Sequence, residues 1–600
     1  MSLPAFSTQA ELFSTAGLSA SLFPESDRYR LFAKLVYPRL AANRAALEKC
    51  YCADNGRVAL EPVLMLGTSI LQYLDGVPDR QAVEMLHYHA GWNFALNRQL
   101  GDEVFHPSSL VNFRHRLEEH EQGAVGFTTI LNALEEAGLV SRQSRQRLDS
   151  TQMFGRVARM SLLDCVRESL RLALKELEGV LTPETRPVFW VGLWERSVES
   201  QTDYRAGSET LARKLAESGT DAWQLLAWLR QPAQTEWAAG GQAQLLARVF
   251  AEQFEIQAGQ AAPAAQEKIA VATSGATVAP APQVDGAVTG PPKEDPTQGP
   301  AVGHGAVIQP KDKKQLASDR VQNPHDPEAT YAVKGQGAQK KEHVGYKVQV
   351  AETVCEADLA AGEPTRNFIT GIVTHPACES DQAGAVKMEA EQAAMGLDKP
   401  PVQYVDAAYV SAQKLVQAQA EGREIIGSAL PGPQKEGRFT AAEFQVKVEE
   451  RQAICPAGKA SPQCTRLLEE STGKVSYRFE FSTQCHDCPL RDRCLGKDQR
   501  HRTLVVGEHH TALQARRQEQ QTDAFKQRMK HRNAIEGTQS ELVRAHGLRR
   551  ARYRGLAKVK LQNYLIGAAC NVKRWIRREI WKLQHAVSAV ATEAATVPTH

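Results

Sequence analysis

A stretch without any periodic pattern separates two differently patterned parts of this 600-residue chain. Residues 258–309 consist mainly of Ala, Pro, Gly, Val and Thr, as in ATVAPAPQVDGAVTGPPKEDPTQGP, which predicts a flexible linker. The remainder is too long for one core, and with 42% hydrophobic residues it predicts roughly two to four domains with sizeable interiors. Helical patterns dominate before the linker, whereas strand patterns dominate after it.

The part before the linker is predicted to be helical. Four segments between residues 27 and 140 carry apolar residues at three-to-four spacing: RYRLFAKLVYPRL, EPVLMLGTSILQYLDGV, RQAVEMLHYHAGWNFAL and SSLVNFRHRLEEH. The last segment presents Arg114, His115 and Arg116, which either contact DNA or form an ordinary solvated helix face. Residues 155–256 are again helical and rich in Trp, and core packing is the default interpretation of those tryptophans.

The part after the linker is predicted to form an α/β core with a mixed sheet. Its strand-like runs are TYAVKG, HVGYKVQVAETV, NFITGIVTHP, PVQYVD and REIIGSALP, with a helix before the last one. A cysteine-rich insertion, residues 435–506, follows the last strand. Basic helices are then expected from about residue 510 to residue 582.

Three acids stand where strands and a helix could bring them together. Asp406 follows the apolar run VQYV, and Asp149 lies in the β-compatible run around LDSTQMF. Glu536 is expected on a basic helix, one turn after Arg532. Taken singly, each acid is more often a capping or solvated residue. Taken together, they can meet at one edge of a sheet.

The segments around these acids also agree, in order, with a known family. LDST around Asp149, DPEATYAVKG followed by HVGYKVQVAET, YVDAAYVS around Asp406 and RNAIEGTQSELVRAHGLRRARYRGLAKV around Glu536 resemble DDE transposases of bacterial insertion sequences. EPVLMLGTSILQYLDGVPDRQAVEML and FHPSSLVNFRHRL resemble the helical domain that precedes their core. The resemblance implies an RNase H-like mixed-sheet core with an N-terminal all-helical domain. It also implies a helical insertion after the first core strand and a cysteine-rich insertion before the helix that bears Glu536.

The resemblance implies a transposase that cleaves DNA at the ends of an insertion sequence and transfers the strands. Asp149, Asp406 and Glu536 would hold two Mg²⁺ or Mn²⁺ ions about 3.5–4 Å apart, with carboxylate oxygens as the hard ligands that such ions prefer. The expected partners are the terminal inverted repeats and target DNA, bound by a homodimer. Two alternatives remain: a Mg²⁺-dependent nuclease of the same fold, and a transposase-derived DNA-binding protein without catalysis.

The C-terminal helices are strongly basic. From Lys526 to Lys582, sixteen Lys and Arg stand against three acids, which predicts a polyanionic partner. Many members of the resembled family carry a Tyr-x2-Arg-x3-Glu-x6-Lys pattern, of which Arg532 and Glu536 match, while Met529 and Val543 stand at the other two positions. The predicted DNA-contacting residues are Arg114, Arg116, Arg532, Arg544, Arg549, Arg550, Arg552, Arg554, Lys558 and Lys560.

Five of the eleven cysteines fall between residues 455 and 494 and include one Cys-x2-Cys pair. In a reducing compartment this spacing fits metal binding or free thiols better than disulfides. Five thiols offer more ligands than the four of a structural tetrahedral Zn²⁺ site, so the ligand set stays open, and buried free thiols are the alternative. The candidate zinc ligands are Cys455, Cys464, Cys485, Cys488 and Cys494.

Neither an export signal nor a membrane-spanning run is found, so a cytoplasmic, nucleoid-associated protein is expected. The predicted division of the chain is 1–140 as the helical DNA-binding domain, 141–257 as the first core strand and helical insertion, 258–316 as the linker, 317–434 as the core strands and helices, 435–506 as the cysteine-rich insertion, 507–585 as the basic C-terminal helices of the core, and 586–600 as a tail.

Overall fold

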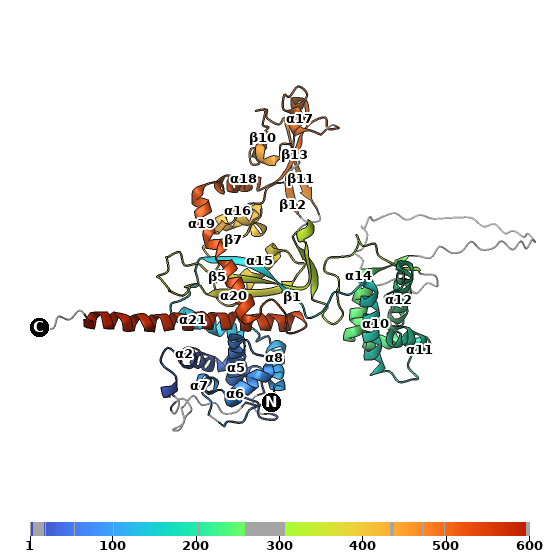
Figure 1. Ribbon diagram of the computed structural model, residues 1–600. Helices are drawn as coiled ribbons and strands as arrows, with labels where there is room; N and C mark the ends of the chain where they lie inside the picture. The colour runs from blue at the N-terminus through green and yellow to red at the C-terminus, as the bar shows by residue number, and fades with distance from the viewer. Residues whose placement is uncertain are drawn as a thin grey trace, which may run out of the picture. The chain divides into compact units, whose positions relative to one another are not determined.

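The protein, seen here in a computed structural model, divides into two compact units (Figure 1). The first consists of residues 1–158 and 328–600, and the second of residues 159–327. The structure describes residues 2–3, 17, 20–52, 55–99, 101–200, 205–257, 307–335, 337–432, 437–470, 473–496 and 498–595, without the side chains of 338 and 587–595. Residues 258–306 of the predicted linker, 258–316, lie outside the described residues.

The first unit begins with a bundle of short helices. α2 (Arg28–Leu35) starts where the Asp27 carboxylate accepts hydrogen bonds from two backbone amides of the first turn. α5 (Pro62–Asp75) has proline at its first position and ends at Gly76, whose φ of 70° is in the left-handed region that favours glycine. The other elements are η1 (Ala20–Leu22), α3 (Tyr37–Ala42), α4 (Arg44–Glu48), α6 (Asp79–Tyr88), α7 (Ala90–Ala95), α8 (Ser108–Glu119) and α9 (Val125–Glu136). They confirm the predicted helical N-terminal region.

A six-stranded mixed sheet forms the centre of the first unit, in the order β4-β5-β1-β7-β8, with β6 paired to a further part of β5. β5 runs antiparallel to β1, β4 and β6, whereas β7 is parallel to β1 and to β8. All five strands predicted after the linker are confirmed. The strands are β1 (Gln146–Phe154), β4 (Thr330–Lys334), β5 (Lys341–Thr353), β6 (Ile369–Pro376), β7 (Val402–Val405) and β8 (Glu424–Ile426).

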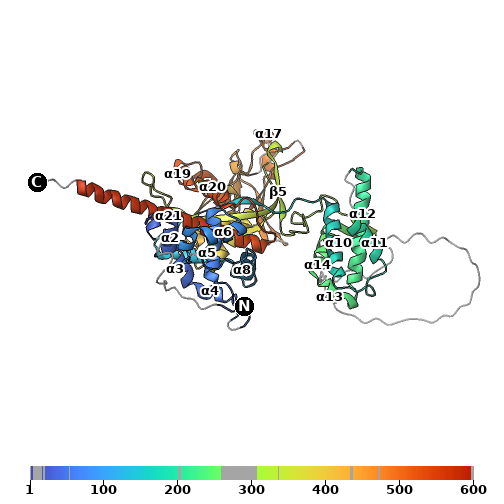
Figure 2. The ribbon, with the colours of Figure 1, turned by 60° about the horizontal axis from the view of Figure 1, so that its bottom comes forward.

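Helices cover both faces of this sheet, as its nearly continuous burial requires. One face packs on α15 (Asp381–Ala394) and α16 (Ala412–Ala420). The other face is covered by α20 (Ile535–His546) and α21 (Leu556–Ala595). α21 packs against β6 on one side and against α5 and α9 on the other, so sheet, α21 and N-terminal bundle share one core (Figures 1 and 2).

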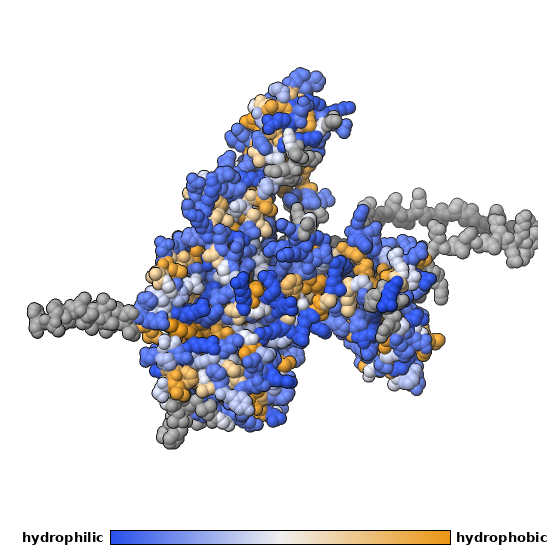
Figure 3. All heavy atoms as spheres, viewed as in Figure 1, coloured by the Kyte–Doolittle hydropathy of each residue, from blue (hydrophilic) through white to orange (hydrophobic). Residues whose placement is uncertain are grey.

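The cysteine-rich insertion lies between β8 and α18 (His510–Glu519) and has a small core of its own, which includes Phe444, Phe479 and Phe481. Gln514 of α18 donates a hydrogen bond to the carbonyl oxygen of Phe444 at 2.7 Å. On the face shown in Figure 3 the insertion, at the top of the view, exposes mainly hydrophilic residues. Its elements are η6 (Ala441–Glu443), β9 (Gln445–Lys447), β10 (Gln452–Ile454), β11 (Gln463–Glu469), β12 (Lys474–Glu480), η7 (Ser482–Cys485), α17 (Arg491–Cys494) and β13 (Thr503–Gly507).

The second unit, residues 159–327, lies between β1 and β4 in sequence and is mainly helical. Trp190 is buried in its core, and Trp223, Trp228 and Trp237 pack against that core, so the predicted role of the tryptophans is confirmed. The elements are α10 (Leu162–Glu178), α11 (Trp190–Trp194), the π-helix η2 (Glu195–Glu199), α12 (Ser208–Leu229), η3 (Pro232–Gln234), α13 (Thr235–Ala238), α14 (Gly241–Gln253), β2 (Phe254–Gln257) and β3 (Val307–Pro310).

The mixed α/β class with a helical N-terminal region is thus confirmed, while the seven-part division of the chain stays a prediction. Among the described residues, no helix combines the length and apolar character needed to cross a membrane.

Candidate functional site

Asp149 and Asp406 lie next to each other because their strands are parallel and in register. Leu148 of β1 pairs with Val405 of β7, so the following residue in each chain segment is an aspartate. Side chains alternate between the two faces of a strand, which places both aspartates on the face opposite Leu148 and Val405, the face that α20 covers. Asp406 follows the end of β7 and caps η5 (Ala407–Tyr409).

Glu536 approaches the same place from the first turn of α20. Gln539, one turn later, donates a hydrogen bond to the carbonyl oxygen of Ser150 at 3.2 Å and so ties α20 to β1 beside Asp149. Arg532 was expected on the same helix as Glu536, but it lies in the last turn of α19 (Asp523–Asn533). The carbonyl oxygen of His531 accepts a hydrogen bond from Arg147 of β1 at 2.9 Å. In a continuous helix this oxygen would instead accept a hydrogen bond from a backbone amide of the next turn.

One guanidinium group contacts all three carboxylates. Nη2 of Arg532 lies 3.0 Å from Oδ2 of Asp149 and 3.7 Å from Oδ2 of Asp406, and Nη1 lies 3.4 Å from Oε1 of Glu536. The exposed fraction of the acidic side chains rises from 13% for Asp149 to 54% for Asp406 and 70% for Glu536. The cluster is therefore anchored in the sheet at Asp149 and open to solvent at the other two acids.

The electrostatic balance at Asp149 disfavours its charged form. Burial raises the pKa of this carboxyl above its usual value, and the nearby carboxylates of Asp406 and Asp381 raise it further. The backbone amide of Ser150 and the guanidinium of Arg532 act in the opposite direction without cancelling the rise. A negative charge at Asp149 is therefore costly until additional positive charge is present.

A buried charge network, missed by the sequence analysis, holds α20 and α21 on β1 and β5. Glu352, fully buried on β5, accepts from Nε of Arg147 at 2.7 Å and from Nη1 of Arg574 at 2.5 Å. The Thr538 hydroxyl on α20 donates to the same carboxylate at 2.7 Å. The available signal was Glu352 itself, a charged residue in the apolar run HVGYKVQVAETV.

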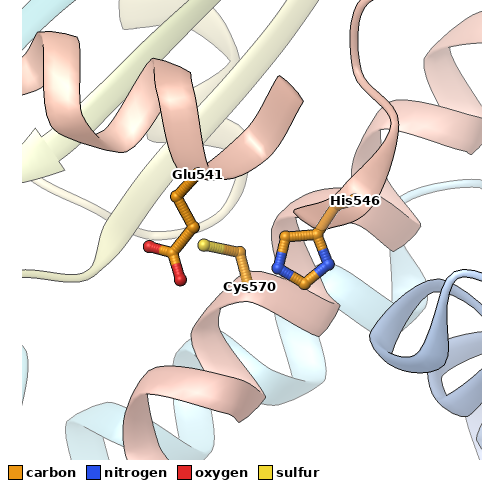
Figure 4. Close-up of side chains that lie close together, drawn as sticks. All are labelled: Glu541, His546 and Cys570. Atoms are coloured by element: carbon orange, nitrogen blue, oxygen red, sulfur yellow. The ribbon is translucent and has the colours of Figure 1, made fainter. Parts of the chain in front are cut away.

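Glu541, His546 and Cys570 are the one group of three potential metal ligands, within the described part of the chain, whose ligand atoms all lie within 4.8 Å of one another (Figure 4). The Glu541 carboxylate is already paired with Arg574 at 2.9 Å and with Lys573 at 3.0 Å. Burial raises the pKa of this carboxyl, but the two cations outweigh burial and lower it to about 2. Because these cations would repel a divalent ion, we interpret the group as part of the packed joint between α20 and α21.

Most predicted DNA-contacting residues lie in or beside residues 547–555, which link α20 to α21. Lys560 is half-buried, and Arg552 is half-buried with its guanidinium 4.5 Å from the centre of the Tyr73 ring. The exposed members are Arg544, Arg549, Arg550, Arg554 and Lys558.

A groove of about 500 Å³ lies between α8 and this link, and Arg156, Arg554 and Lys558 are among its lining residues. Arg114 also borders it, but this side chain is buried, with Nη1 3.1 Å from Asp79 and its guanidinium 5.2 Å from the Tyr553 ring. Its charge is compensated inside the protein, which argues against direct contact with DNA.

Arg116, the other predicted contact on α8, is half-buried, and its guanidinium lies 4.9 Å from the centre of the Tyr51 ring. Unlike Arg114, it borders a second hollow that also includes Arg57 and His106. Arg116 therefore remains nearer to the surface than its neighbour two positions earlier.

Four of the five clustered cysteines line one small cavity of about 20 Å³ in the cysteine-rich insertion. They are Cys455, Cys485, Cys488 and Cys494. Burial raises the pKa of the Cys494 thiol, Arg502 opposes this, and the other three thiols add to the rise. Cys464 lies on β11 and is not part of the lining.

Two family models match the chain. The Transposase DDE domain matches residues 454–576, which include Glu536, and the Transposase domain (DUF772) matches residues 19–116. No curated protein and no solved structure matches. Asp149 and Asp406 lie outside both matched segments, so their proximity to Glu536 is an independent observation. The two matches, in the expected order, support the predicted resemblance to DDE transposases of insertion sequences.

Proposed function

We propose that this transposase cleaves the ends of its own element and joins them to target DNA at a site formed by Asp149, Asp406 and Glu536. The observation that carries the proposal is the meeting of three carboxylates, from β1, the end of β7 and the start of α20, at the guanidinium of Arg532. Two of these acids are largely exposed, so the cluster is accessible to a large substrate such as DNA.

We also propose an RNase H-like fold for the core. In support, β6, β5 and β1 follow one another as antiparallel neighbours, β7 and β8 continue the sheet in parallel, and helices cover both faces. In such a sheet, ligands gather at the carboxyl ends of the parallel strands. Asp406 stands at that end of β7.

The donor set fits divalent cations such as Mg²⁺ or Mn²⁺, which would be held by Asp149, Asp406 and Glu536. Carboxylate oxygens are the ligands that these ions prefer, and three acids here face one arginine. The raised pKa of Asp149 is in keeping with a site that needs further positive charge. When bound, such ions activate the attacking oxygen and stabilise the leaving oxygen of an in-line displacement at phosphorus.

The proposed chemistry has two displacements. In the first, water attacks the phosphodiester at the end of the element, one P–O bond breaks and a 3′-hydroxyl is released. In the second, that hydroxyl attacks a phosphodiester of the target DNA, so one P–O bond forms as another breaks. Arg532 is proposed to orient the carboxylates and to contact a phosphate. Joining two ends calls for two such sites, so we propose that two chains act together on DNA.

The test is a cleavage and joining assay on the terminal DNA of the element with Mg²⁺, comparing the wild type with Asp406→Asn. We expect the variant to lose cleavage and joining by about 10²-fold or more, because loss of a ligand removes several kcal/mol of transition-state stabilisation. Asp358→Asn, which changes an exposed acid outside the cluster, is the matched control and should retain activity.

The same assay separates the alternatives. A nuclease of this fold would release nicked or cut DNA without joined products. A DNA-binding protein without catalysis would shift the DNA in a gel but leave it intact with Mg²⁺ and with Mn²⁺, in wild type and variant alike. Either pattern would overturn the proposed strand transfer.

A further inference from the structure

We propose that Cys455, Cys485, Cys488 and Cys494 bind one structural Zn²⁺ ion in the cysteine-rich insertion, and that Cys464 is not a ligand. The spacing of five cysteines leaves the ligand set open, whereas the fold brings four of them to one cavity. The proposal does not depend on the activity of the carboxylate cluster, because it concerns a different part of the first unit.

The four cysteines come from short turns that close on one another. Cys455 follows β10, and the amide of Gly458 donates to the Cys455 carbonyl oxygen at 2.8 Å, with Gly458 at a φ of 75°. Cys485 ends η7, Cys488 follows in the next turn, and Cys494 ends α17. A tetrahedral Cys₄ site requires ligands from such separate turns, one pair typically in Cys-x2-Cys spacing.

The cavity has the size and walls of a closed ion site. Its volume of about 20 Å³ holds roughly one water-sized body. Apart from the thiols, much of its lining is apolar, including Phe439, Phe481, Leu490 and Leu495. A water there would find few hydrogen-bond partners, whereas an ion held by four thiolates needs none from the walls.

The thiols must move inward to close the site. Tetrahedral Zn–S bonds of about 2.3 Å place sulfur atoms about 3.8 Å apart. Among the described residues, no three of these sulfurs lie within 4.8 Å of one another. Rotation of a cysteine side chain between staggered rotamers moves its sulfur without moving the backbone. The proposed site therefore requires side-chain rotation that brings the four sulfur atoms together.

The charges and hydrogen bonds around the cavity suit bound thiolates. Four thiolates and one Zn²⁺ carry two net negative charges, and two arginines, Arg491 and Arg502, border the same cavity. The backbone amide of Arg502 donates to Sγ of Cys485 at 3.5 Å. The guanidinium of Arg491 donates to the carbonyl oxygen of Cys485 at 2.9 Å, and the guanidinium of Arg502 donates to that of Cys494 at 3.3 Å. Such outer contacts fix ligand-bearing turns in metal sites.

The site also answers a structural need. The insertion consists of strands of three to seven residues around a small core, to which Cys485 and Cys494 themselves belong. Metal binding by a small unit contributes directly to its folding free energy. With all four positions taken by thiolates, no position is open for water or substrate, so the ion has a structural role. The hydrogen bond between Gln514 and the Phe444 carbonyl oxygen connects the insertion to α18.

Metal analysis of the purified full-length protein tests the proposal. We expect one zinc ion per chain in the wild type and in Cys464→Ser. Cys488→Ser should lose zinc by more than about tenfold, since even loss of an outer-shell partner costs about 10–100-fold in metal affinity. Cys464→Ser is the matched control, a cysteine of the same insertion outside the cavity.

A second measurement keeps the test decisive if Cys488→Ser does not fold. Wild-type protein loaded with Co²⁺ should show thiolate-to-cobalt charge-transfer absorption and the visible bands of a tetrahedral ion, and a thiol-modifying reagent should release one zinc ion per chain. Wild-type protein that remains folded but metal-free after incubation with Zn²⁺ would overturn the proposal. So would an equal loss of zinc in Cys464→Ser and Cys488→Ser. Neither readout involves DNA, so failure here is distinct from failure of strand transfer.

Discussion

Asp149 carries a 13% exposed carboxylate that faces Asp406 and Arg532 on the covered face of the sheet. Burial raises the folded-state pKa of Asp149 above its unfolded value. The resulting stabilisation of the folded state is fully present below the usual pKa of 3.8, where the group is neutral, and it is lost as pH rises through the folded-state pKa. At neutral pH the ionised group therefore lowers the free energy of unfolding. We expect Asp149→Asn to raise the Tm of the metal-free protein at neutral pH and to change it little at about pH 3.

The measurement is thermal unfolding as a function of pH, in buffer with a chelator, followed by titration with Mg²⁺. Mg²⁺ should raise the Tm of the wild type, since a ligand that binds only the folded state stabilises it, and should raise that of Asp149→Asn much less. A metal-free Asp149→Asn protein that is less stable than wild type at neutral pH would contradict the electrostatic account, because Arg532 would then be the dominant partner.

At the residue scale, motif reading singled out Asp149, Asp406, Glu536 and Arg532, since each stands within a recognisable run of residues, and the structure places these four side chains together. It could not predict the partners of Glu352, because the partner of a buried charge is not encoded near it in sequence. The groups that compensate Glu352 lie on β1 and α21, as far away as Arg574. Only the folded chain shows that this acid is internal and paired.

At the scale of elements, the position of α20 depends on that buried pairing. Glu352 is fully buried between Arg147 and Arg574, which are each 4% exposed. Glu352→Gln would leave the buried Arg147 without a carboxylate and Arg574 with Glu541 alone, and breaking a buried pair in this way costs about 3–5 kcal/mol. We expect a loss of that order in the free energy of unfolding, measured by urea denaturation with two optical probes.

Glu536→Gln, which changes a residue of α20 itself, is the matched comparison for Glu352→Gln. The Glu536 side chain is 70% exposed, so its substitution should change the free energy of unfolding by no more than about 0.5 kcal/mol while abolishing the proposed strand cleavage. Stability losses of similar size in the two variants would show that the buried network does not anchor α20.

The strands after the linker were predictable because alternation and β-branched residues mark each of them locally. Their pairing was not predictable in the same way. β1 lies at the centre of the sheet although the whole second unit, residues 159–327, separates it in sequence from β5. The break between α19 and α20 was missed as well, because Ala534 carries no helix-ending signal. The contact from Arg147 to the His531 carbonyl, which marks the break, is a tertiary contact.

At the scale of the first unit, α21 connects the N-terminal helices to the sheet. The N-terminal helices and the sheet were predicted as separate domains, yet α21 packs on both, and Phe127 of α9 and Ile372 of β6 both approach Gly567. Side chains added at Gly567 would meet Phe127 at 3.0 Å, so glycine permits this close approach. Motions of the bundle relative to the sheet are therefore restrained by a shared core.

Charge over the whole molecule is concentrated rather than large: the net charge is +3, while the region from Lys526 to Lys582 carries sixteen basic residues against three acids. Exposed Arg554 and Lys558 border the groove beside α8. If each contacts one phosphate, Arg554→Gln with Lys558→Gln should reduce the slope of log affinity against log salt by about 1.8, because each phosphate contact contributes about 0.9.

DNA affinity measured at several salt concentrations, on terminal DNA without divalent cations, checks this slope. Lys447→Gln with Arg466→Gln removes two exposed charges from the cysteine-rich insertion and is expected to leave the slope unchanged. Arg114→Gln should also leave it unchanged but lower the Tm, because its guanidinium is paired with Asp79 inside the protein. If all three variants reduce the slope equally, the phosphate contacts are spread over the surface and the groove is not the site where DNA binds.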